Sequence, residues 1–230
     1  MTLIIFDQWE DGALLVTDTV TSLTPDRPIG FATKVWTLPH LNMAFTVTGP
    51  GALGYVLRAS IDDVCDGPDI EAINEIVPEV LRAARAAIEA NGEEVGIGSS
   101  VLLFGFPEGS NRMLSYQYRT STDFEPTERF EGQRFGMLPH CMGELVRPDT
   151  IEGYIELANR VREDNARGEV PPPGRSILIG GDLFATIVRP WNIQTTRVHR
   201  FPNYEETQAS IRHEAAQRDE AILRGDPSGK

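Results

Sequence analysis

The sequence has few cysteines and no concentration of positive charge. Cys65 and Cys141 are the only two cysteines among 230 residues, and they lack the spacing of metal ligands. This excludes a disulfide-stapled scaffold and favours buried thiols in a reducing compartment. The net charge is −13, and arginine-containing pieces such as "RVHR" (197–200) are isolated. We therefore expect no nucleic-acid partner, because nucleic-acid binders normally carry a basic patch or stripe.

Long apolar runs are also missing. No apolar stretch approaches the roughly 18 to 20 residues that span a bilayer, and no basic segment precedes "LIIF" (3–6) as a signal peptide would require. We expect no membrane partner and a cytoplasmic location. The four histidines lack metal-ligand spacing, so no metal site is expected.

The first fifth of the chain has the pattern of a β-hairpin followed by further strands. Two short apolar runs, 3–6 and 13–17, flank the turn signal Asp11-Gly12. Residues 23–33 are polar and contain two prolines, which predicts a connecting loop. Residues 34–51 predict two more strands and then a glycine-rich turn.

Helical spacing of apolar residues begins after this turn. Helices are predicted over 52–64 and over 69–91, with Asp69 as an N-cap and a kink or break at Pro78. Further helices are predicted over 149–164 and 204–223. Further strands are predicted over 99–106, 112–120, 127–136, 176–190 and 194–202.

Helices and strands occur in blocks and do not alternate strictly. This order favours an α+β fold, an antiparallel-sheet sandwich covered by helices, over a doubly wound parallel fold. We expect residues 1–203 to form a single domain and residues 204–230 to form a C-terminal helix and tail.

Thr2 directly follows Met1 and has two interpretations. It is either an ordinary residue of the first hairpin or, once Met1 is removed, an N-terminal nucleophile. A threonine hydroxyl is weak unless a base takes its proton, and a free α-amine with a pKa of about 7.7 to 8.0 can serve as that base. Such a site also needs a cation, a carboxylate that holds the cation, and N–H donors for an oxyanion. Asp18 and Lys34 are candidates for the charges, and 49–51 (Gly-Pro-Gly) for the donors.

The order of these residues resembles the N-terminal part of proteasome β-type subunits and their bacterial relatives, the N-terminal-nucleophile (Ntn) hydrolases. Asp18 and Lys34 follow Thr2 by 16 and 32 positions, which matches the family pattern without a gap. The matching segments are "TDTVTS" (17–22), "KVWTL" (34–38), "TVTGPG" (46–51) and "LIGGDLFATIVR" (178–189).

The resemblance implies a four-layer αββα sandwich of two antiparallel sheets and a threonine-type hydrolase without cofactor. It assigns Thr2 as nucleophile and α-amine base, Asp18 and Lys34 as its charged support, and Gly49 as the oxyanion donor. Ser22 and Thr48 are expected to border the substrate. It further implies a self-assembled ring or spiral, a peptide or unfolded polypeptide as substrate, and an ATP-dependent unfoldase as partner.

The second half of the chain departs from the family pattern. Family members carry a serine-glycine turn whose hydroxyl supports the threonine amine, and Met137 stands where that serine is expected. Asp164 aligns with the aspartate of a later Asp-x-x-Ser-Gly segment, and either Ser176 or Gly180-Gly181 aligns with its end, across an inserted "NARGEVPPPG".

Two other functions stay open at the level of sequence. One is a catalytically inactive scaffold or assembly subunit, and the other is a small-molecule acylase of the same superfamily. In the simplest structural interpretation, Asp18 is a turn or cap carboxylate and Lys34 is a solvated charge on an edge strand.

Overall fold

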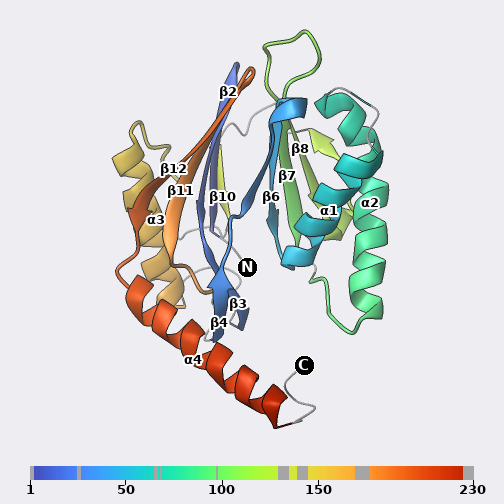
Figure 1. Ribbon diagram of the computed structural model, residues 1–230. Coiled ribbons are helices and arrows are strands. Elements are labelled where there is room, and N and C mark those ends of the chain that lie inside the picture. The colour runs from blue at the N-terminus through green and yellow to red at the C-terminus, as the bar shows by residue number, and fades with distance from the viewer. Residues whose placement is uncertain are drawn as a thin grey trace.

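The computed structural model of the chain describes residues 3–24, 27–64, 67, 69–96, 98–128, 135–138, 145–168 and 177–224. Two five-stranded antiparallel sheets face each other, and helices cover their outer faces (Figure 1). The expected four-layer αββα sandwich is therefore confirmed.

The first sheet holds the start of the chain at its centre. Its spatial order is β10 (Phe135–Leu138), β1 (Ile4–Trp9), β2 (Gly12–Asp18), β11 (Asp182–Arg189) and β12 (Asn192–Arg200). The predicted hairpin pairs Ile4 with Thr17, and its turn is Glu10-Asp11, one residue before the expected Asp11-Gly12, because Gly12 already pairs with Trp9. Asp18, the last residue of β2, lies opposite Leu183 of β11.

The second sheet continues the chain after a small hairpin. Its spatial order is β5 (Val35–Leu38), β6 (Met43–Thr48), β7 (Ser100–Gly105), β8 (Leu114–Arg119) and β9 (Thr127–Glu128). A 3₁₀ turn, Pro39–Leu41, separates β5 from β6. Another, Thr120–Thr122, follows β8.

The helices bury one apolar stripe each against these sheets. Helices α1 (Gly51–Val64) and α2 (Ile70–Ala90) pack on the second sheet, and α3 (Ile151–Ala166) packs on the first. The run 3–6, which leads into β1, is continuously apolar for a structural reason. Leu3 and Ile5 face α3, whereas Ile4 and Phe6 pack between the two sheets. Because both faces of a central strand are buried, no polar alternation remains.

Helix α2 begins and ends as predicted. The Asp69 carboxylate accepts hydrogen bonds from the backbone N–H groups of Glu71 and Ala72, each at 3.1 Å. The helix continues through Pro78 without a break, so the alternative of a break there is wrong.

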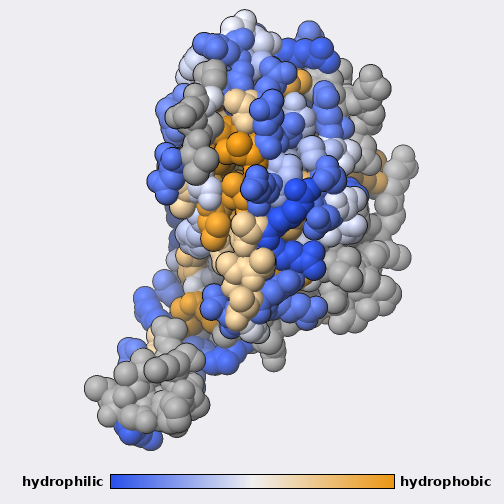
Figure 2. Space-filling view, turned by 90° about the vertical axis from the view of Figure 1, so that its right-hand side faces the viewer, coloured by the Kyte–Doolittle hydropathy of each residue, from blue (hydrophilic) through white to orange (hydrophobic). Residues whose placement is uncertain are grey.

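The view turned toward α1 and α2 shows hydrophilic side chains around a narrow apolar band (Figure 2).

Three strand predictions need correction. Strands β3 (Val20–Thr24) and β4 (Arg27–Phe31) pair as an antiparallel hairpin, where a loop was expected over 23–33. Pro28 is tolerated because this two-stranded sheet consists of edge strands only. Strand β11 begins at Asp182 and not at 176, because Gly181 adopts a φ of +81°. Of the strand expected over 127–136, residues 127–128 belong to β9 and 135–136 to β10; residues 129–134 lie outside the described part.

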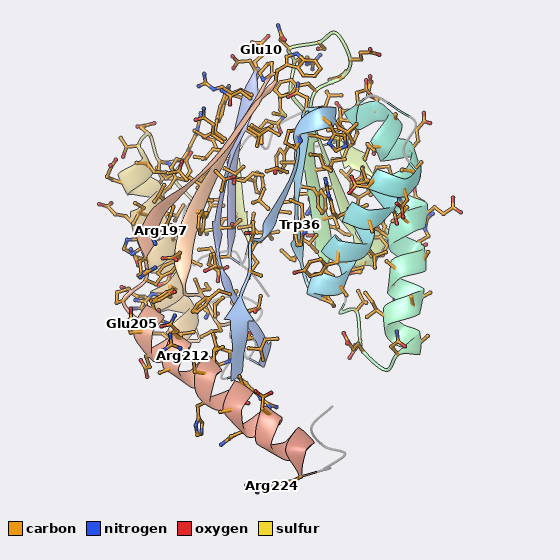
Figure 3. All side chains as sticks on the ribbon, in the orientation of Figure 1. Glu10, Trp36, Arg197, Glu205, Arg212 and Arg224 are labelled. Carbon is orange, nitrogen blue, oxygen red and sulfur yellow. The ribbon has the colours of Figure 1, made fainter. Side chains whose placement is uncertain are left out.

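Helix α4 (Tyr204–Leu223) confirms the predicted C-terminal helix and extends past the sandwich beneath β3 and β4 (Figure 1). Tyr204 stacks on Phe31 of β4, whereas Glu205 and Arg212 point away from the sandwich (Figure 3). None of the described helices combines the length and apolar character that crossing a membrane requires.

Candidate active site

Asp18 lies at the end of β2 with no exposed surface. Its Oδ1 accepts a hydrogen bond from the Leu3 N–H at 3.0 Å, and its Oδ2 accepts one from the Gly180 N–H at 3.3 Å. The Lys34 ammonium lies 3.5 Å from Oδ1. Asp18 is therefore held by donors from three separate parts of the chain.

Lys34 immediately precedes β5 and is 6% exposed. Its Nζ donates a hydrogen bond to the Val20 carbonyl at 2.7 Å, in addition to its ion pair with Asp18. This burial contradicts the interpretation of Lys34 as a solvated charge on an edge strand. A buried ammonium beside a buried carboxylate is costly to desolvate, so such a pair needs further hydrogen bonds, and these are present.

Burial raises the pKa of the Asp18 carboxyl above its usual range. The Lys34 charge opposes this rise most strongly, and the Gly180 and Leu3 N–H groups add to the opposition.

Gly49 forms the turn between β6 and α1 and has a φ of +106°. A Cβ at this position would lie 2.2 Å from Ser99 Oγ and 2.7 Å from Ser99 Cβ, so only glycine fits. The neighbouring Thr48 hydroxyl pairs with Ser100 Oγ at 3.1 Å and accepts the Ser100 N–H at 3.0 Å. Ser99 and Ser100 thus brace the turn that carries Gly49.

A cleft of about 550 Å³ opens beside these residues. Lys34, Gly49 and Ser22 line it, whereas Asp18 lies behind Lys34 and the Thr48 side chain is turned into the Ser100 network. Trp36 forms part of its wall (Figure 3). The structure therefore brings together four of the six predicted site residues: Asp18, Ser22, Lys34 and Gly49. Thr48 faces away from the cleft, and Thr2 lies outside the described residues.

The Gly180-Gly181 pair supports the site from the far end of the chain. The Gly180 carbonyl accepts the N–H groups of Thr19 and Val20, each at 3.3 Å, while its own N–H binds Asp18. A Cβ on Gly181 would lie 2.3 Å from Thr19 Oγ1. The sequence analysis included this pair in the family-matching segment 178–189 but missed its contact with Asp18. The double glycine was the sequence feature that could have indicated this contact.

The residues aligned with the serine-glycine support occupy structural positions. Met137 is 1% exposed in β10, paired with Ile5, and belongs to the core under α3. Asp164 pairs with Arg167 near the end of α3. Ser176 lies outside the described residues.

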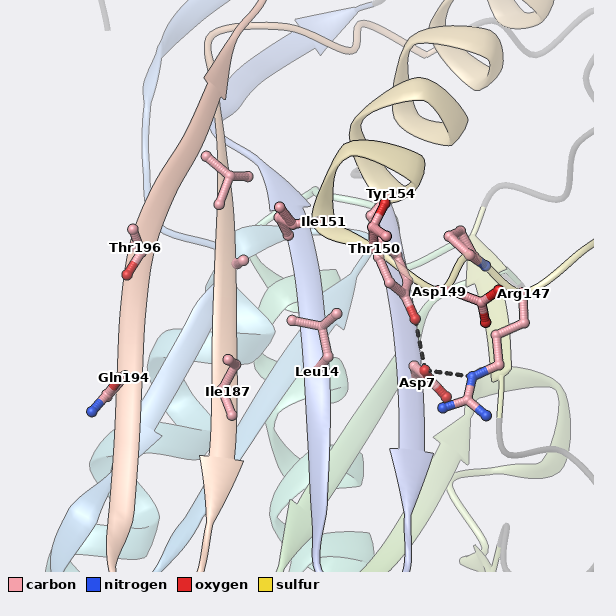
Figure 4. Close-up of a pocket in the computed structure, with 13 residues that line it drawn as sticks. Asp7, Leu14, Arg147, Asp149, Thr150, Ile151, Tyr154, Ile187, Gln194 and Thr196 are labelled. Carbon is pink, nitrogen blue, oxygen red and sulfur yellow. Dashed lines mark hydrogen bonds and ion pairs between the residues drawn. The ribbon is translucent and has the colours of Figure 1, made fainter.

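A second cavity, of about 460 Å³, lies on the outer face of the first sheet beside the start of α3 (Figure 4). There, the buried Asp7 Oδ2 accepts hydrogen bonds from Tyr154 OH at 2.6 Å and from Arg147 Nε at 2.7 Å. Burial, followed by the Asp7 contact, raises the pKa of Tyr154. These contacts attach the segment before α3 to β1, away from Lys34. In the part of the chain that the structure describes, no cluster of histidine, cysteine or acidic residues is suited to hold a metal ion.

Comparison by sequence identifies no relative, since no family model and no curated protein matches the chain. Comparison of structures does. The chain matches Anbu from Hyphomicrobium sp. strain MC1 with a TM-score of 0.62 at 13% identity, covering 96% of this chain and 97% of that one. It matches Anbu (ancestral beta-subunit) from Yersinia bercovieri with a TM-score of 0.61 at 10% identity, covering 96% of both chains. A third match, at 14% identity with a TM-score of 0.62 and 96% coverage of both chains, is the helical assembly of the Anbu complex from Pseudomonas aeruginosa. At these identities the likeness concerns the fold, and the chain therefore shares the proteasome-like Ntn-hydrolase fold of Anbu.

Proposed function

We propose that the protein is an N-terminal threonine hydrolase that cleaves peptide bonds after removal of Met1. The observation that carries the proposal is the buried Asp18–Lys34 pair, whose lysine lines the same cleft as Gly49. Leu3, the residue after Thr2, donates its backbone N–H to Asp18. Asp18 is therefore bonded to the residue that follows the proposed nucleophile in the sequence.

The reaction begins when the Thr2 hydroxyl attacks the peptide carbonyl and transfers its proton to the Thr2 α-amine. The nearby Lys34 ammonium lowers the pKa of the attacking hydroxyl and of the amine, and Asp18 keeps Lys34 in position. The Gly49 N–H stabilises the negative oxygen of the tetrahedral intermediate. The leaving amine takes the proton from the Thr2 α-ammonium group, and an ester remains on Thr2. Water then hydrolyses this ester.

We further propose that the protein acts in the cytoplasm as a self-assembled ring or spiral. The Anbu complex from Pseudomonas aeruginosa forms a helical assembly on the same fold, which supports self-assembly here. Enclosure of the cleft would restrict access to peptides and unfolded polypeptides, and an ATP-dependent unfoldase is the partner that this arrangement calls for.

The decisive experiment combines mass spectrometry with a nucleophile variant. Intact mass should show that Met1 is absent from the purified protein. Hydrolysis of fluorogenic peptides should disappear in Thr2→Ala and persist, at reduced rate, in Thr2→Ser, since serine retains the hydroxyl. Retained Met1, which turns the Thr2 amine into an amide, or equal activity of wild type and Thr2→Ala would refute the proposal.

A scaffold without turnover is the second candidate function. The buried position of Met137 in β10 favours it, because this segment offers a core strand where the family pattern has a hydroxyl-bearing turn. A Thr2→Ala variant that assembles and sustains the biological role of the wild type would support the scaffold. Hydrolysis that depends on Thr2 would exclude it.

A further inference from the structure

The cleft has a rigid aromatic wall. Trp36 stacks on Phe45 with ring centroids 5.2 Å apart and an interplanar angle of 5°, and Tyr55 meets Trp36 edge-on at 5.9 Å. A Cβ on Gly54 would lie 2.5 Å from the indole, which shows how closely α1 approaches this ring. The wall is therefore fixed from two sides and offers a flat apolar surface to a ligand.

Lys34 and Glu93 are the charged side chains among the residues found to line the cleft. The Lys34 ammonium is committed to Val20 and Asp18. Glu93 is exposed, and among the residues that the structure describes no cationic side chain pairs with it. The cleft therefore presents a carboxylate that is available to a ligand.

The backbone of Glu93 is fixed by the way α2 ends. Gly92 has a φ of +84°, and its N–H donates to the Glu89 carbonyl at 3.0 Å. The Glu93 N–H donates to the Ile88 carbonyl at 3.3 Å. These two bonds form a Schellman motif, which holds the first residues after a helix in one conformation. Further along, the Thr120 hydroxyl donates to the Gly96 carbonyl at 3.1 Å.

We propose that Glu93 is a specificity-determining residue, and that the cleft selects peptides carrying a lysine or arginine side chain. The aliphatic stem of such a side chain packs on Trp36 and Tyr55, and its cationic head reaches Glu93. The net charge of −13 adds a general attraction for cationic peptides. This inference names the substrate class of the cleft and rests on the proposed function.

Binding to the assembled Thr2→Ala protein tests the inference without turnover. Two fluorescent peptides are compared that are identical except for the last residue, arginine in one and norleucine in the other. Norleucine keeps an apolar stem without the charge. We expect the arginine peptide to bind about three- to tenfold more tightly, from one exposed ion pair and a cation–aromatic contact. Added salt should reduce this ratio.

Glu93→Gln and Glu94→Gln form the matched pair of variants. Both remove one exposed carboxylate from the same loop, but only Glu93 lines the cleft. In Glu93→Gln the arginine and norleucine peptides should bind with about equal affinity, whereas Glu94→Gln should keep the preference for arginine. Equal effects of the two variants, no preference in the parent protein, or no binding of either peptide would overturn the inference.

The outcome for the proposed function is read separately. Selective binding together with no Thr2-dependent hydrolysis in the wild type would refute the hydrolase and leave the inference intact. Thr2-dependent hydrolysis with no preference for arginine over norleucine would refute the inference and leave the hydrolase intact.

Discussion

Replacing Gly49 by alanine should be far more damaging than an ordinary glycine substitution. The new methyl group would lie 2.2 Å from Ser99 Oγ, 2.7 Å from Ser99 Cβ and 3.4 Å from Ser99 Cα. Rotation of the Ser99 hydroxyl relieves only the first of these contacts, so either the Ser99 backbone or the Gly49 turn must shift. The φ of +106° adds backbone strain for any residue with a Cβ.

Gly168 provides the matched control at the end of α3. Its φ is +72°, but a Cβ there would have nothing within 4 Å. Alanine at Gly168 therefore costs backbone strain alone, about 1–2 kcal/mol. Alanine at Gly49 adds overpacking of about 1–3 kcal/mol. The expected losses of unfolding free energy are thus about 2–5 kcal/mol for Gly49→Ala and about 1–2 kcal/mol for Gly168→Ala.

Urea unfolding of both variants at one fixed protein concentration measures these losses, since assembly would add to the apparent stability. For a chain of this size, each kcal/mol should also lower the melting temperature by roughly 2–4 °C. Peptide hydrolysis should fall by about 10²–10³-fold in Gly49→Ala if the turn shifts its N–H. Equal losses of stability at Gly49 and Gly168 would refute the argument that Ser99 restricts this turn.

Three other predictions concern buried polar groups. Lys34→Met should cost about 3–5 kcal/mol, because Asp18 stays buried without a counter-charge, and adding Asp18→Asn should recover part of this loss in chemical unfolding. Tyr154→Phe should cost about 1.5–3 kcal/mol, because its hydroxyl donates to the Asp7 carboxylate; a thermal melt indistinguishable from wild type would contradict this. Tyr118 and Tyr154 should ionise above the usual tyrosine range in an alkaline absorbance titration, since burial raises the pKa of both. Because their folded pKa is raised, they contribute stability that is present below pH about 10 and lost as the pH rises further; ionisation of all five tyrosines near pH 10 in the folded protein would be the contrary result.

Patterns within a single element allowed much of the fold to be predicted. The apolar stripe and the Asp69 cap of α2, the hairpin of β1 and β2 and the C-terminal helix are all encoded within short windows. The hairpin of β3 and β4 was missed for the opposite reason. Its two prolines are strong local signals for a loop, and the pairing of Val20 with Phe31 that overrides them has no local sequence signature.

In the candidate site, too, some features could be predicted from the sequence and others could not. The side chains of Asp18 and Lys34 could be chosen by type and spacing, and the structure pairs them at 3.5 Å. The groups that hold this pair are backbone atoms of Leu3, Val20 and Gly180. A backbone N–H or carbonyl is present at nearly every residue, so its role cannot be inferred from residue identity.

Gly180 illustrates the consequence for function. It lies 162 residues from Asp18 in the sequence, yet its N–H binds Asp18 and its carbonyl binds Thr19 and Val20. Val20 in turn accepts the Lys34 ammonium. The geometry of the charged pair therefore depends on a backbone segment in the second half of the chain. The departures from the family pattern in that half concern side-chain hydroxyls, whereas this bracing uses only main-chain atoms and a glycine pair, both of which the chain retains.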